Sequence, residues 1–165
     1  MRKLVLITAL GTAIVLQSVT ALAGKQVYPG SMCVRWNQNE SVPVLNGSRI
    51  YNPSSTQEMH VDCPILHQNF DPNTGNNLDD ADIGVIDTNT TRNASCWLTA
   101  LYQINSTLYG TTGGTRGTAG FGSHEQNLDF NGTGRHAENW YYIGCSIPRA
   151  ENGQQSGITY FSGQD

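Results

Sequence analysis

The chain has 165 residues, with 9 Lys and Arg against 13 Asp and Glu, and charged residues make up only 13% of it. This fraction is about half the usual ~25%, which excludes disorder driven by high charge. Residues 1–23 carry two of the basic side chains, so seven basic and thirteen acidic side chains remain after them, a formal charge of −6. An acidic chain does not neutralise phosphates, and we expect neither a nucleic-acid partner nor an anionic membrane partner.

The first 23 residues have the pattern of a cleavable export signal. A short basic start at 1–3 precedes an apolar run at 4–16, and Ala-Leu-Ala at 21–23 supplies the small residues that signal peptidase accepts. The apolar run is shorter than the ~20 residues needed to cross a bilayer. We therefore expect a cleaved signal at 1–23, a single domain at 24–165 without a membrane span, and secretion to the extracellular space or the periplasm.

Short apolar runs after the signal alternate with clusters of Gly, Pro, Asn and Asp, and no stretch sustains the spacing of an amphipathic helix. Two runs alternate clearly: in one, Val61 and Cys63 face away from His60, and in the other, Ile143 and Cys145 share a face. Residues 94–103 fit either a strand or a helical face, and we assign them as a strand. The predicted strands are 31–36, 48–51, 59–66, 82–87, 95–103, 126–130, 140–147 and 158–162.

About eight short strands with turn residues between them predict an all-β fold. One open sheet would leave its apolar rows in water, so we expect an antiparallel two-sheet sandwich or jelly roll. A closed barrel is the main alternative.

All four cysteines, Cys33, Cys63, Cys96 and Cys145, lie after the signal. An even number in an exported chain predicts two disulfides. The wide gaps between them contain no Cys-x-x-Cys pair, which argues against a zinc cluster or a redox pair. Three pairings are possible. We favour Cys33 with Cys63 and Cys96 with Cys145, because sequential pairing suits a sandwich whose early and late strands each close locally.

An acidic stretch between the third and fourth predicted strands is a candidate calcium site, and calcium is the one cofactor that the sequence suggests. Oxygen-bearing side chains around a glycine turn suit a hard cation. The match to a calcium loop is incomplete, because Gly75 stands at the third ligand position. A solvated turn whose Asn and Asp cap their own backbone is the alternative. The candidate ligands are Asp71, Asn73, Asp79, Asp80 and Asp82.

Residues 110–122 consist mainly of Gly and Thr and predict a long mobile loop. A loop of this length is either a plain connection or a binding element. A phosphate-binding glycine loop would need a preceding strand and a following helix, and the sequence shows neither.

Several large aromatic residues lie on predicted strands and are candidates for stacking against sugar rings. Alternation places Trp140 and Tyr142 on the face opposite Cys145, so we select these two as the binding candidates. Packing in the core is the alternative. The aromatic set is Trp36, Trp97, Trp140, Tyr141 and Tyr142.

Six short blocks follow one another in a fixed order around the four cysteines: YPGSMC at 28–33, YNPSS at 51–55, VDCPI at 61–65, VID at 85–87, SCWL at 95–98 and YIGCSIP at 142–148. In this order the chain resembles a loose group of small exported four-cysteine bacterial proteins of unassigned function. The likeness covers most of residues 28–161. It implies an all-β chain and carries no catalytic residues across.

Together these features predict a secreted non-enzymatic β-sandwich module that binds glycans or surfaces, or contributes to an extracellular assembly. The alternative is an extracellular hydrolase acting on polysaccharide. It would use Asp79, Asp80 and Asp82 near His60 and His67. The sequence contains no Gly-x-Ser-x-Gly elbow and no histidine pair at metal-ligand spacing.

Overall fold

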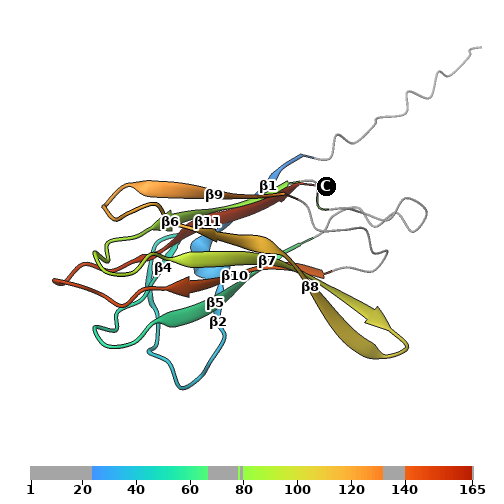
Figure 1. The fold of residues 1–165 in the computed structure, drawn as a ribbon, viewed down its shortest axis with the longest axis horizontal. Helices are drawn as coiled ribbons and strands as arrows, with labels where there is room; N and C mark the ends of the chain where they lie inside the picture. The colour runs from blue at the N-terminus through green and yellow to red at the C-terminus, as the bar shows by residue number, and fades with distance from the viewer. Residues whose placement is uncertain (1–23, 67–77, 79, 132–139, 165) are drawn as a thin grey trace, which may run out of the picture.

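The computed structural model describes residues 24–66, 78, 80–131 and 140–164. In these residues the chain forms eleven strands and one short 3-10 helix, η1 (Gly30–Met32). The strands make two antiparallel sheets that pack face to face (Figure 1). The predicted all-β, two-sheet architecture is confirmed.

The first sheet has the order β3 (Val44–Asn46), β4 (Arg49–Tyr51), β11 (Gly157–Gln164), β6 (Asp80–Ile86), β9 (Glu125–Asn131), and β1 (Gln26–Pro29) also pairs with β11. The second sheet has the order β2 (Val34–Arg35), β5 (Met59–Ile65), β10 (Trp140–Ile147), β7 (Ser95–Ile104), β8 (Thr107–Gly117).

The core lies between the sheets because side chains alternate along each strand. In β5 every second residue is buried, and in β10 the residues opposite them are buried as well. Successive side chains of a strand point to opposite faces, so the same period leaves the other residues on the outer face of the second sheet. The buried rows of these strands are Met59, Val61, Cys63, Ile65, Tyr141, Ile143, Cys145 and Ile147.

Two disulfides link neighbouring segments of the second sheet on its buried face. Cys96 and Cys145 are directly opposite in the β7–β10 ladder, with Cα atoms 4.1 Å apart. Cys33, immediately before β2, bonds Cys63 in β5, also with Cα atoms 4.1 Å apart. This is the sequential pairing favoured from the sequence. The Cys33–Cys63 disulfide fixes the chain that leads into the two-residue strand β2.

The glycine-rich segment is a strand, and the prediction of a mobile loop at 110–122 is wrong for most of its length. Thr107–Gly117 forms β8, which pairs with β7 in a hairpin that extends past the rest of the sandwich (Figure 1). The hairpin turns at Asn105 and Ser106, whose φ angles of 48° and 66° match a two-residue primed turn. Cross-strand pairing with β7 therefore outweighs the backbone freedom of the glycines.

Other strand predictions differ at their ends. Residues 31–36 were predicted as one strand, but η1 occupies their start and β2 covers only Val34–Arg35. The short edge strands β1 and β3 were not predicted. The assignment of 95–103 as a strand is confirmed by β7. No helix in the described part of the chain is long and apolar enough to span a membrane.

A buried carboxylate joins several strand ends. Asp87, immediately after β6, accepts hydrogen bonds from Ala94 N at 2.8 Å and Thr118 Oγ1 at 2.5 Å on Oδ2. Its Oδ1 accepts from Ser156 Oγ at 3.2 Å and Asn89 N at 3.1 Å. Asp87 therefore connects the end of β6 to the segments flanking β7, β8 and β11.

Candidate functional site

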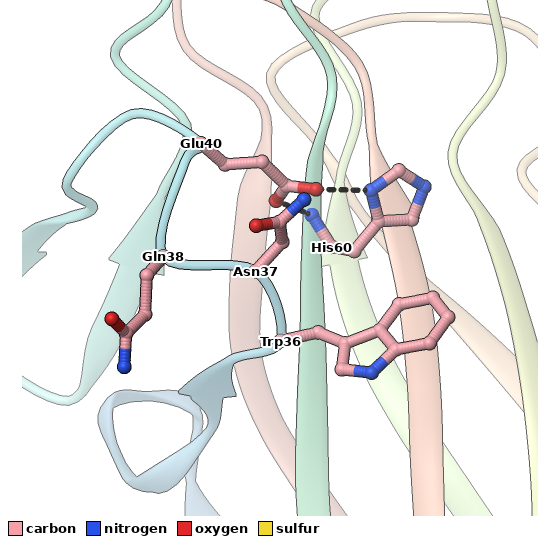
Figure 2. A pocket seen from close by; sticks show the side chains of 5 residues that line it. All are labelled: Trp36, Asn37, Gln38, Glu40 and His60. Carbon is pink, nitrogen blue, oxygen red and sulfur yellow. Dashed lines mark hydrogen bonds and ion pairs between the residues drawn. The ribbon is translucent and has the colours of Figure 1, made fainter.

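The loop that follows β2 and the start of β5 border an open pocket on the outer face of the second sheet. Figure 2 shows its five lining side chains. The pocket has a volume of about 510 Å³ and is lined by Trp36, Asn37, Gln38, Glu40 and His60.

Local hydrogen bonds fix the shape of this loop. Trp36 N donates to His60 O at 2.9 Å, which continues the β2–β5 pairing by one residue. Asn39 N donates to Asn37 Oδ1 at 3.0 Å in an Asx turn, and Glu40 N donates to Asn37 O at 3.2 Å. Arg35 Nη1 donates to Glu40 O at 2.5 Å. The loop is thus held at both ends and across its turn.

The Glu40 carboxylate orients His60. Oε2 accepts from His60 N at 2.7 Å, and Oε1 lies 2.8 Å from His60 Nδ1. A carboxylate only accepts hydrogen bonds, so His60 Nδ1 carries a proton. In the tautomer with hydrogen on Nδ1 alone, Nε2 is an acceptor. Figure 2 shows Nε2 directed away from Glu40. It has no hydrogen-bond partner among the described residues, so it is available to a ligand hydroxyl.

Trp36 supplies the apolar part of the site. Its indole is 66% exposed and meets the His60 ring edge-on, with ring centroids 5.9 Å apart and an interplanar angle of 76°. Exposed tryptophan beside fixed polar groups combines a flat stacking surface with hydrogen-bonding atoms. Sugar rings require this combination, because they present C–H faces and hydroxyl edges at the same time.

A smaller polar pocket is lined by Thr56, Glu58, Arg92 and Arg149, and Ser146 connects its Glu58 to the strand position opposite His60. Ser146 of β10 is directly opposite His60 in the β5–β10 ladder, and its Oγ donates to Glu58 Oε2 at 3.0 Å. Glu58 also pairs with Arg92, which lowers the pKa of the Glu58 carboxyl. The Ser146 hydroxyl is therefore committed to Glu58. Among the described residues no hydroxyl hydrogen-bonds to His60 as the nucleophile of a Ser-His pair would.

The two aromatic candidates from the sequence lie on this same outer face. Trp140 begins β10 and is 57% exposed, and Tyr142 is half-buried. Tyr141, between them, points into the core. Both side chains thus lie on the face that alternation predicts, while their role in binding stays a prediction.

The acidic candidates lie elsewhere. Asp80 and Asp82 are in β6 of the first sheet, where the Lys25 ammonium contacts both carboxylates. Tyr160 of β11 adjoins this group, and burial together with the negative charge of Asp82 raises the pKa of Tyr160 to about 12. No group of three or more His, Cys, Asp or Glu in the described residues is arranged to hold a metal ion. Asp71, Asn73 and Asp79 lie outside the described residues.

The grouping of acids and histidines proposed for a hydrolase is also corrected. Asp80 and Asp82 belong to β6 of the first sheet, whereas His60 belongs to β5 of the second sheet and is bonded to Glu40. The two sets are therefore on different sheets of the sandwich. Asp79 and His67 lie outside the described residues.

The pocket was not predicted from the sequence. Trp36 was predicted only as one of several strand aromatics. His60 was placed opposite the apolar face of its strand and in the hydrolase alternative, and Glu40 was not singled out. The contact of Glu40 with His60 spans 20 residues and depends on β2 pairing with β5. The available signal was a tryptophan and a glutamate in an otherwise Asn- and Gln-rich turn that begins three residues after Cys33.

No family model and no curated protein matches the sequence significantly. Solved structures do match. CBM86, a low affinity xylan binding module from Roseburia intestinalis, has 11% identity and a TM-score of 0.53, with 86% of this chain and 96% of that chain covered. The carbohydrate-binding module CBM36 in complex with calcium and xylotriose has 12% identity and a TM-score of 0.44, with 86% and 99% covered.

A family two carbohydrate esterase from Cellvibrio japonicus matches at 8% identity and a TM-score of 0.45, over 86% of this chain. The chain spans about a third of the length of that esterase, 33%. The likeness to the CBM86 module shows a shared β-sandwich fold.

Proposed function

We propose that this protein is a secreted, non-catalytic module that binds a neutral polysaccharide at the pocket of Trp36 and His60. The observation that carries the proposal is the Trp36 indole, which is 66% exposed although its backbone and ring are fixed against His60. An ordered, exposed aromatic ring loses little conformational freedom when a ligand stacks on it.

The charges around the pocket favour an uncharged ligand. Glu40 is bonded to His60, and Glu58 is paired with Arg92, so the acidic groups near the pocket already have partners. Arg35 donates to the backbone carbonyl of Glu40. A uronic acid would meet the carboxylates of Glu40 and Glu58, whereas the hydroxyls of a neutral sugar can donate to His60 Nε2.

Two further observations support the proposal. The fold is shared with a xylan-binding module, which makes xylan a reasonable first probe. The two disulfides favour an oxidising compartment, in agreement with the predicted export signal.

Affinity gel electrophoresis tests the proposal. The protein without its signal is run through native gels containing xylan, mixed-linkage β-glucan, galactomannan or polygalacturonate. We expect retardation by at least one neutral polysaccharide and none by polygalacturonate. The variant Trp36→Ala should migrate in these gels as it does in a gel without polysaccharide. Its melting temperature should be unchanged, because an exposed ring leaves no cavity when it is removed.

Phe121→Ala is the matched control, since Phe121 is 61% exposed but lies in the segment between β8 and β9 of the chain, away from the pocket in sequence. It should be retarded like the wild type. The proposal fails if no polysaccharide retards the wild type, or if Trp36→Ala is retarded equally. Release of reducing sugar by the wild-type protein would instead support the hydrolase alternative.

A further inference from the structure

The outer face of the second sheet continues from the Trp36 pocket to Trp140. Ser146 is opposite His60 at the pocket end of β10, and Trp140 is at the other end of the same strand. Six residues of a strand span roughly 20 Å at about 3.3 Å per residue. Both end tryptophans are mainly exposed, at 66% for Trp36 and 57% for Trp140.

Aromatic side chains also occupy the middle of this face. Trp97 of β7 is opposite Gly144 of β10, and a Cβ atom on Gly144 would lie 2.6 Å from Trp97 Nε1. The half-buried Trp97 ring therefore lies across the backbone of β10. Tyr142, half-buried, follows on the same face of β10 and is opposite Thr99. The aromatic residues thus form a row that runs from the end of β2 across β5 to the Trp97 ring over β10 and then along β10 to its start: Trp36, His60, Trp97, Tyr142 and Trp140.

The middle of this row has one ionisable neighbour. Asp62 of β5 is opposite Gly144, and burial raises the pKa of the Asp62 carboxyl. The other neighbours in the middle of the sheet are Pro64 and Thr99. The row therefore offers stacking surfaces with a single carboxyl between them. The hydroxyls of a long neutral polymer can donate to this carboxyl, whereas an anionic polymer would be repelled by it.

We propose that this row is a continuous platform for an extended neutral polysaccharide chain, which occupies the Trp36 pocket and reaches Trp140 through several consecutive sugar units. The inference rests on the proposed function and adds to it the length of the ligand. Affinity then rises with chain length, because each further sugar adds a contact without a second loss of translational freedom.

Calorimetric titration with xylobiose, xylotetraose and xylohexaose tests the platform, and the matching series is used if another neutral polysaccharide retards the protein in gels. We expect the hexasaccharide to bind at least about tenfold more tightly than the disaccharide. Trp140→Ala should remove most of this difference and leave the binding of the disaccharide unchanged. Trp36→Ala should weaken binding at every length, and Phe121→Ala should change neither.

The outcomes separate the two proposals. The platform is overturned if all lengths bind with equal affinity, or if the Trp140→Ala variant binds the hexasaccharide as tightly as the wild type. In either case, a loss of sugar binding in Trp36→Ala would still support the proposed function. Full binding by Trp36→Ala would overturn both. The melting temperature of each variant is first compared with that of the wild type, so that a folding defect is not taken for a binding defect. Tyr142→Phe and Trp140→Leu provide milder substitutions on the same face.

Discussion

The indole of Trp97 covers Gly144 so closely that a Cβ atom at position 144 would lie 2.6 Å from Nε1 of the ring. The first sheet repeats this arrangement, because a Cβ atom on Gly84 would lie 2.4 Å from Cε1 of Tyr160. In both sheets an aromatic side chain of one strand lies over a glycine of the neighbouring strand. These glycines are therefore required by cross-strand packing.

The substitution Gly144→Ala tests this packing. The added methyl group must displace the Trp97 ring, and overpacking of this kind costs about 1 to 3 kcal/mol. We expect a lower free energy of unfolding in chemical denaturation and a changed tryptophan emission. Gly110→Ala in β8 is the control, because its Cβ would lie 3.4 Å from Leu101 Cδ2, an ordinary contact. Equal stability of the Gly144 variant and the wild type would contradict the packing.

Tyr160 should make stability depend on alkaline pH. Burial and the charge of Asp82 raise its pKa from 10.0 to about 12 in the folded protein. The unfolded chain ionises this phenol near its ordinary pKa, so its contribution to stability is complete below about pH 10 and is lost as the pH rises to about 12. Tyrosine absorbance should show a phase of ionisation near pH 12 that Tyr160→Phe lacks. An identical titration of the variant would exclude this assignment.

Asp87 should be a major polar contributor to stability. Asp87→Asn removes an acceptor from a buried carboxylate that takes four hydrogen bonds, and leaving a buried donor unpaired costs about 1 to 3 kcal/mol. The exposed Asp129→Asn is the matched control, with an expected change within about 0.5 kcal/mol. Denaturant unfolding compares the two. Similar midpoints for both variants would show that the Asp87 network contributes little.

Much of the sandwich could be predicted from the sequence, because alternation is strong where one face of a strand is buried. Residues 59–66 and 140–147 were predicted almost to their observed bounds, and β10 matches its prediction, Trp140–Ile147. β8 was missed because glycine and threonine form no apolar row. Its strand structure comes from pairing with β7, which is a tertiary effect.

The site could be predicted only in part, for a different reason. Trp140 and Tyr142 were placed on the outer face by alternation within one strand. The pocket of Trp36, Glu40 and His60 instead depends on the pairing of β2 with β5, which the Cys33–Cys63 disulfide anchors. Contacts between segments so far apart leave no periodic pattern in a single sequence.

Calcium should have little effect on the fold. A cation at residues 71–82 that used Asp80 and Asp82 would have to displace Lys25 from both carboxylates. We therefore expect the same melting temperature in excess chelator and in millimolar calcium. A rise that depends on calcium concentration and is reversed by chelator would show that calcium binds the folded state, as the sequence pattern suggested.

The three tryptophans provide the most direct test of the proposed glycan site, because each contributes one indole N–H signal to an NMR spectrum. The signals are assigned with Trp36→Ala and Trp140→Ala, and the isotope-labelled protein is titrated with oligosaccharides of the polysaccharide that retards it in gels. We predict that the Trp36 signal shifts with the shortest oligosaccharide and that the Trp140 signal shifts only with the longer ones. A Trp36 signal that stays unchanged while the oligosaccharide binds would contradict the assignment of this pocket as the glycan site.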